Sequence, residues 1–146
     1  MTEYQSREDF AIGEKARLSR RISEADIRCM ADLTGDFNPL HMDDDFARQT
    51  RFKSRIAHGE FSVGLISAVL GTRLPGPGAE HIKQTLNFLS PIRVGDTLTA
   101  EVEVTAWRPD KRIITVATRC YIGDGKDVAA GEAVLLVVDK DDNCPD

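Results

Sequence analysis

The sequence has few cysteines, the residues that form disulfide bonds in small domains and bind structural metals. Only three of its 146 residues are cysteines. Cys29, Cys120 and Cys144 form neither a CxxC pair nor a cysteine/histidine spacing that suits zinc. An odd, scattered set excludes a disulfide framework and points to no metal. We therefore expect Cys29 and Cys120 to be small core residues and Cys144 to be a free thiol in the C-terminal tail.

Long hydrophobic runs are also missing. The longest apolar stretches, such as residues 133–138, fall far short of the roughly 20 residues that a membrane-spanning helix needs. Residues 1–9 lack the basic start and the continuous apolar segment of a signal peptide. The sequence therefore predicts a cytoplasmic protein without a membrane partner.

Positive charge is in deficit, with 19 basic against 24 acidic side chains and a formal net charge of −5. This balance makes a nucleic-acid partner unfavourable, since such proteins must neutralise phosphates. A chain of 146 residues with 41% hydrophobic and 29% charged residues has the composition of a soluble globular protein. We expect a single domain over residues 1–146, in which the acidic residues 139–146 form a flexible tail.

The first half of the chain shows helical patterns after a short strand near residues 16–21. Ser23 and Asp26 have the spacing of a capping box, and apolar residues then recur at helical spacing until Gly35. Residues 35–50 are rich in Asp, Asn and Pro and predict an ordered loop with one helical turn. Residues 59–71 are apolar on almost every side, which predicts a fully buried helix.

From residue 79 onward the hydrophobic period changes to two. Residues 98–105 and 114–120 alternate apolar and polar side chains, which is typical of half-buried strands. Turn residues at 108–111 and 123–125 join them to each other and to a last strand at 128–138. We expect an α+β fold in which an antiparallel sheet curls around the buried helix.

Residues 35–43 place a carboxylate and an imidazole on one proline-stiffened loop. Asp36 and His41 lie five residues apart and can converge on one small molecule. A neutral imidazole accepts a proton from water near pH 7 and a nearby carboxylate orients that water, which suits general acid/base catalysis. The alternative is structural, because Asp36 and Asn38 can close an Asx turn while His41 lies on the surface.

A second candidate group, residues 55–59, directly precedes the apolar helix. A glycine at a helix start allows an acyl group to approach the backbone closely, and the free N–H groups there can bind a developing enolate oxygen. Gly59 is therefore a candidate oxyanion donor. The alternative is that Gly59 only starts the helix and that His58 is a hydrogen-bonded core residue.

These motifs carry a resemblance to a known family. Residues 36–41 read Asp-Phe-Asn-Pro-Leu-His, and His58-Gly59 follows seventeen residues after His41. Together with residues 71–78 and 88–96, this order resembles the MaoC-like hydratases, particularly the (R)-specific enoyl-CoA hydratases. The resemblance covers nearly the whole chain. It implies a hot-dog fold, normally a homodimer with clefts between the subunits.

The resemblance also implies roles for individual residues. Asp36 and His41 occupy the catalytic positions of the family, and the N–H of Gly59 occupies the oxyanion position. Asn38 would support the loop, and Ser67 matches a serine that lines the active site of the family. The chain departs from common members at Glu60, where an apolar residue is usual.

The implied reaction is hydration of a trans-2-enoyl-CoA to the (R)-3-hydroxyacyl-CoA, with an acyl-CoA thioester as substrate and no metal or redox cofactor. Three alternatives remain open. They are a 3-hydroxyacyl-carrier-protein dehydratase, a hot-dog acyl-CoA thioesterase and a non-catalytic acyl-CoA-binding module. A thioesterase typically uses a lone carboxylate, and a binding module needs no acid/base pair, so the pairing of Asp36 with His41 argues against both.

Overall fold

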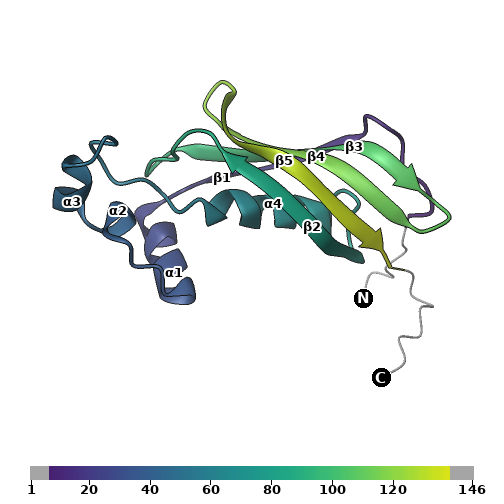
Figure 1. Ribbon diagram of the computed structural model, residues 1–146, viewed down its shortest axis with the longest axis horizontal. Coiled ribbons are helices and arrows are strands. Elements are labelled where there is room, and N and C mark those ends of the chain that lie inside the picture. The colour runs from purple at the N-terminus through teal and green to yellow at the C-terminus, as the bar shows by residue number, and fades with distance from the viewer. Residues whose placement is uncertain (1–6, 139–146) are drawn as a thin grey trace.

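The computed structural model describes residues 7–138, which form five strands and four helices. In chain order the elements are β1 (Lys15–Arg21), α1 (Glu24–Thr34), α2 (Pro39–Met42), α3 (Asp44–Arg48), α4 (Glu60–Thr72), β2 (Ala79–Phe88), β3 (Thr97–Arg108), β4 (Ile113–Ile122) and β5 (Lys126–Val137). Figure 1 shows the sheet lying over α4, with α1, α2 and α3 gathered beside the start of that helix. Within these described residues, no helix has the length and apolar character needed to cross a membrane.

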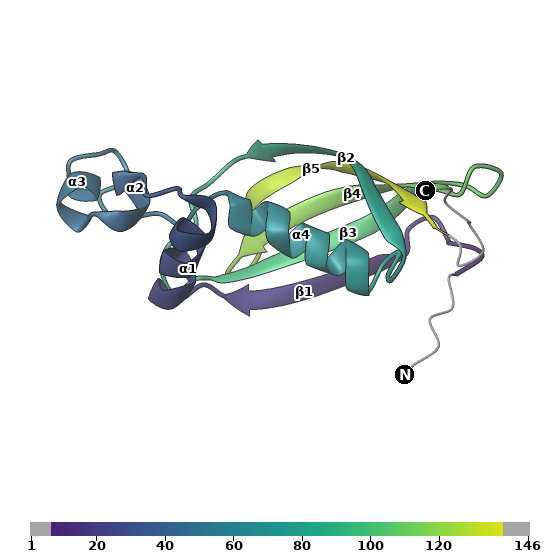
Figure 2. The same ribbon diagram turned by 90° about the horizontal axis from the view of Figure 1, so that it is seen from below.

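The five strands form one antiparallel sheet in the order β1-β3-β4-β5-β2. The sheet is curved, and α4 lies along its concave face between the edge strands β1 and β2 (Figure 2). Adjacent strands twist relative to one another, so a long sheet curls and can enclose one helix. This arrangement is the hot-dog fold, and it confirms the predicted α+β class with a helix wrapped by the sheet.

The core lies between α4 and the inner face of the sheet. Inward residues of β4 alternate with half-buried ones, as the period of two predicts, and they meet the buried face of α4, which includes Ile66, Val69 and Leu70. Where β2 crosses β5 the backbones approach so closely that a Cβ on Gly131 would lie 1.8 Å from the Thr85 carbonyl oxygen. Only glycine fits there.

The cysteine predictions have mixed outcomes. Cys120 is buried, as expected, and burial raises the pKa of its thiol to about 11. Cys29 is exposed on α1, so its assignment to the core was wrong. The buried face of that helix is formed by Ile27 and Ala31, and Cys29 falls on the opposite side. Cys144 and the predicted tail at 139–146 lie outside the described residues.

The expectation that α4 is buried on all sides was also wrong. Gly64 and Ser67 are exposed, because the sheet of a single chain covers only one face of the helix. Beyond the first turn, the exposed strip of α4 consists of Gly64, Ser67 and Thr72, whose side chains are small and uncharged. Such a strip suits contact with another surface rather than contact with water.

The segment that leads to α4 contains more helix than predicted. The capping box of Ser23 and Asp26 is present at the start of α1, and Gly35 ends this helix in the left-handed region with φ of 78°. The following loop holds two short helices, α2 and α3, where one turn was expected. Asn38 and Asp43 accept hydrogen bonds from backbone N–H groups at their starts, which explains how such short helices are held.

Candidate active site

Asp36 lies directly after the glycine that ends α1. Its Oδ1 accepts a hydrogen bond from the Asn38 N–H at 3.2 Å, and Asn38 Oδ1 in turn accepts one from the Leu40 N–H at 3.0 Å. The Asx turn considered as a structural alternative is therefore present. It occupies only one carboxylate oxygen of Asp36, so Oδ2 is left to face the neighbouring histidines. Turn formation and chemistry are compatible at this residue.

His41 lies on α2 and is buried, with 8% of its surface exposed, which excludes the surface alternative. Its Nδ1 lies 2.8 Å from the carbonyl oxygen of Ile56. A carbonyl oxygen only accepts, so Nδ1 carries the proton of the neutral ring and Nε2 keeps a lone pair. The fold thus holds His41 in the tautomer that can act as a base through Nε2.

His58 is a third member of the group, which sequence reasoning treated only as a core residue. It is fully buried, and its Nε2–H donates to the Asp36 carbonyl oxygen at 3.0 Å while lying 4.0 Å from Asp36 Oδ2. Its ring stacks on that of His41 with centroids 4.1 Å apart. His58 is thus a hydrogen-bonded core residue, as one alternative held, but only through Nε2, because Nδ1 is buried without a partner within the described residues. Its position in the sequence directly before Gly59, a candidate site residue, could have indicated that His58 belongs to the site.

One ligand atom from each of Asp36, His41 and His58 lies within 4.8 Å of the others. Such a set has the residue types that a divalent cation uses. However, the His58 nitrogen that faces the carboxylate already donates its proton to a carbonyl oxygen. Oδ2 of Asp36, the Nε2 lone pair of His41 and Nδ1 of His58 have no hydrogen-bond partner among the described residues, and the first two suit a shared water molecule and acid/base chemistry.

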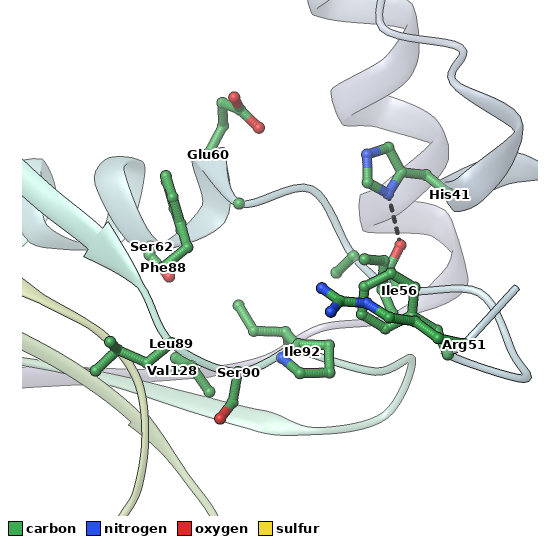
Figure 3. A pocket seen from close by; sticks show the side chains of 14 residues that line it. His41, Arg51, Ile56, Glu60, Ser62, Phe88, Leu89, Ser90, Ile92 and Val128 are labelled. Atoms are coloured by element: carbon green, nitrogen blue, oxygen red, sulfur yellow. Dashed lines mark hydrogen bonds between the residues drawn. The ribbon is translucent and has the colours of Figure 1, made fainter.

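His41 borders a pocket of about 340 Å³ that opens between the start of α4 and the segment after β2. Figure 3 shows His41 and Arg51 on one side of this pocket, with Glu60 and Phe88 facing them. The other residues that line it are Phe52, Ile56, Ala57, Gly59, Ser62, Leu89, Ser90, Pro91, Ile92 and Val128.

Gly59 lies where the pocket meets the N-terminus of α4. No described residue accepts a hydrogen bond from its N–H, which leaves this donor available at the positive end of the helix dipole. A Cβ at this position would lie 2.8 Å from Cε1 of Phe88. The glycine therefore keeps the backbone approachable from the pocket, as an oxyanion site requires.

Neither of the two predicted substrate-binding residues, Asn38 and Ser67, lines this pocket. Asn38 caps α2 and is exposed, so its visible role is to hold the loop that carries His41. Ser67 is exposed on the outward face of α4 and is not among the described residues that line the pocket. Ser62, which the sequence analysis missed, is buried and lines the pocket one turn into the helix. Glu60 does line the pocket and makes it more polar, as its unusual identity suggested.

Arg55 holds the loop against α1. Its guanidinium donates to both carboxylate oxygens of Glu24, at 2.8 and 2.6 Å, to Asp44 at 2.9 Å and to the His41 carbonyl oxygen at 3.2 Å. The hydrogen bonds to Glu24 raise the pKa of Arg55 above its ordinary value, and Arg55 lowers the pKa of Glu24. The side chain is only 14% exposed, so these bonds are partly shielded from water.

A hot-dog fold that places a half-exposed carboxylate and a buried imidazole beside a helix N-terminus defines a class of proteins suited to reactions of acyl thioesters. Residues 9–123 match the family described as "MaoC like domain". The chain belongs to this MaoC-like family, as its motifs indicated.

Curated relatives and solved structures are similar over most of the chain. An (R)-specific enoyl-CoA hydratase of Rhodospirillum rubrum is 52% identical over 130 residues, which cover 89% of this chain and 90% of the relative. A 3-hydroxybutyryl-CoA dehydratase of Methylorubrum extorquens is 47% identical over 94% of this chain and 87% of its own. The solved (R)-hydratase of Aeromonas caviae is 46% identical with a TM-score of 0.84, covering 88% of this chain and 98% of that structure.

Proposed function

We propose that this protein adds water to a trans-2-enoyl-CoA to form the (R)-3-hydroxyacyl-CoA, and that it catalyses the reverse dehydration. The observation that carries the proposal is the tautomer of His41, whose Nδ1 meets the Ile56 carbonyl oxygen and whose Nε2 keeps a lone pair. His41 lines the pocket, and one ligand atom of each of His41, Asp36 and His58 lies within 4.8 Å of the others. Relatives named as (R)-specific enoyl-CoA hydratases and a 3-hydroxybutyryl-CoA dehydratase, at 46–52% identity, support it.

In this mechanism the thioester carbonyl oxygen accepts a hydrogen bond from the Gly59 N–H. Water is held between Asp36 Oδ2 and His41 Nε2. His41 removes one proton as the water oxygen bonds to C3, and the electron pair of the C2=C3 bond moves toward the carbonyl to form an enolate. The helix N-terminus stabilises the negative charge on that oxygen.

The enolate is then protonated at C2, which completes the addition of one water molecule. If the imidazolium of His41 returns the proton, both new bonds form on the side of the alkene that faces the acid/base pair. A syn addition of this kind gives the (R) product when the chain lies in the orientation that the family implies. No metal or redox cofactor takes part, since every step uses protein groups.

Asn38 and Ser67 take supporting places in the proposal. Asn38 keeps α2 in register and so positions His41. Ser67 lies on the face of α4 that the sheet leaves uncovered, and in the proposal a second subunit closes a substrate cleft over that face. A homodimer therefore belongs to the proposal, with the edge strand β2 and its exposed Ile82 and Phe88 also available for contact. We place the enzyme in the cytoplasm.

The dimer is tested by sedimentation of the purified protein at micromolar concentration. We expect a species of twice the chain mass that carries the activity. A stable monomer with full activity would remove the second subunit, and with it the role of Ser67, from the proposal.

The reaction is tested by the loss of enoyl absorbance on a series of trans-2-enoyl-CoA thioesters of increasing chain length, without added cofactor. Chiral chromatography of the product should show the (R)-3-hydroxy acid. The Asp36→Asn variant serves as the matched control, because it changes one carboxyl oxygen to an amide nitrogen. If no enoyl thioester reacts, or if a chelator abolishes turnover, the proposal is wrong.

A 3-hydroxyacyl-carrier-protein dehydratase is the second candidate, because it performs the same chemistry in reverse. The relatives with that name, such as the mitochondrial one of Arabidopsis thaliana, are 31% identical to this chain. Enoyl thioesters of CoA and of a carrier protein, compared at equal concentration, separate the two. Preference for the carrier protein would favour the dehydratase.

A further inference from the structure

One cation at the pocket takes no part in the mechanism above. Arg51 lies in the segment between α3 and α4 and lines the same pocket as His41 and Gly59. Its side chain extends toward the cavity from the side that carries His41 (Figure 3). The acyl chain and the reacting alkene carry no negative charge that could pair with Arg51.

No carboxylate among residues 7–138 pairs with Arg51. Residues 48–55 carry four cationic side chains and no carboxylate. Two of the four are paired with acids elsewhere, Arg48 with Asp45 at 3.1 Å and Arg55 with Glu24 and Asp44. Within residues 7–138 neither Arg51 nor Lys53 has an ion-pair partner, and Arg51 instead lies over the ring of Phe52 at 4.8 Å. A positive spot thus persists in a chain of net charge −5.

The size of the pocket shows which part of a CoA thioester meets this spot. At about 340 Å³ it lies at the small end of the roughly 300–1,000 Å³ that drug-sized ligands occupy. It can hold the acyl group and part of the pantetheine arm. The nucleotide end must therefore lie at or outside the pocket mouth, where exposed residues such as Arg51 are.

We propose that Arg51 binds a phosphate group of the CoA thioester and so selects CoA as the carrier, an inference that rests on the proposed function. The planar guanidinium offers parallel N–H donors that match phosphate oxygens. Contact with the ring of Phe52 restrains the side chain, which lowers the entropy lost when the phosphate binds.

Glu60 places a negative charge on the wall of the pocket that faces Arg51. It lines the same pocket from the first turn of α4, across from Arg51 (Figure 3). A carboxylate there repels phosphate, so the nucleotide end is directed toward Arg51 and the uncharged acyl end toward His41 and Gly59. Together, the charges of Arg51 and Glu60 determine which end of the substrate enters the pocket.

The test compares two substrates that share the reacting group. Crotonyl-CoA carries the phosphates, whereas crotonyl-pantetheine lacks them. Arg51→Ala should raise the KM for crotonyl-CoA by about 10- to 100-fold, the usual effect of losing a hydrogen bond to a charged group, and should leave its kcat near the wild-type value. The kinetics on crotonyl-pantetheine should not change. Arg51→Lys should recover part of the loss, because it keeps the positive charge but lacks the parallel N–H donors of the guanidinium.

Two matched variants control for charge alone. Arg48→Ala removes a neighbouring cation that does not line the pocket, and it should leave both substrates unaffected. Glu60→Gln removes the repelling carboxylate and should lower the KM for crotonyl-CoA only. Added salt should raise the KM of the wild-type protein for crotonyl-CoA, because it screens the attraction between Arg51 and phosphate. It should leave the KM of Arg51→Ala unchanged.

Several results would overturn the inference. An equal loss on both thioesters would mean that Arg51 shapes the loop, and no loss on either would mean that it binds nothing. A loss confined to crotonyl thioesters of a carrier protein would assign Arg51 to that protein. Calorimetric binding of free CoA gives a readout independent of turnover. If no enoyl thioester reacts, the proposed function fails, while weaker binding of CoA but not of pantetheine to Arg51→Ala would still support the phosphate contact.

Discussion

Replacing Gly59 by valine tests whether the backbone at the start of α4 takes part in the reaction. Gly59 has φ of −59° and ψ of −25°, a conformation that any residue adopts, so the substitution strains no dihedral angle. The new Cβ would lie 2.8 Å from Cε1 and 3.2 Å from Cδ1 and Cζ of Phe88. Phe88 is 60% exposed, so its ring can move aside without disturbing the core.

These contacts predict a large kinetic effect and a small effect on stability. Valine is a poorer helix N-cap than glycine, which costs about 1 kcal/mol of unfolding free energy. In contrast, loss of an oxyanion donor typically lowers the rate by about 100- to 1,000-fold, or about 2.7–4 kcal/mol of transition-state stabilisation. The branched side chain and the displaced Phe88 both occupy the space through which the thioester oxygen must approach the N–H.

The assay measures single-turnover rates and thermal melting on the same samples of Gly59→Val and of the smaller change Gly59→Ala. Gly71→Ala is the matched control, since it lies in the same helix and an added Cβ there would meet no described atom within 4 Å. It should keep the wild-type rate. A wild-type rate per folded molecule in Gly59→Val would refute the assignment and leave Gly59 as a helix start only.

Three further outcomes are expected. Asp36→Asn and His41→Ala should each lower kcat by about 100-fold or more with unchanged circular dichroism, and near-normal rates would reduce the loop to its Asx turn. Arg55→Ala should release the His41 backbone and lower kcat by up to about 100-fold, with partial recovery in Arg55→Lys; full activity of the alanine variant would exclude a positioning role. Gly131→Ala places a Cβ 1.8 Å from the Thr85 carbonyl oxygen, so overpacking of about 1–3 kcal/mol or more should lower the melting temperature, and an unchanged melt would contradict this close approach.

Local chemistry in the sequence was enough to predict most of the elements. The capping box at Ser23, the helix end at Gly35 and the period of two after residue 79 each depend on neighbours in the chain, and each is present in the structure. Only one helical turn was expected after Gly35 where the structure has two short helices, since their stability comes from side-chain caps at Asn38 and Asp43 and not from any apolar period.

Burial depended on more than local pattern. Cys29 was placed in the core from its residue type, yet the face of α1 that packs inward is set by Ile27 and Ala31. The apolar helix α4 was expected to be buried all round, because a pattern without a polar face cannot show that one sheet covers only one side. The outward strip with Gly64 and Ser67 became visible only when the sheet was in place.

By itself, then, the sequence determined the class of fold through its hydrophobic periods and the loop that carries Asp36 and His41 through its turn residues, and its motifs resembled those of the MaoC-like family. Only the tertiary structure decided the state of the site. It brings Ile56 to Nδ1 of His41, which selects the tautomer, and it stacks His58 against His41. It also places Arg51, which has no ion-pair partner within residues 7–138, at the pocket that Gly59 lines. The hydrogen bonds and the ring contact of the two histidines join residues 15 to 22 positions apart. Hydrophobic period and capping are local patterns, so they cannot predict which distant carbonyl oxygen a ring nitrogen will meet.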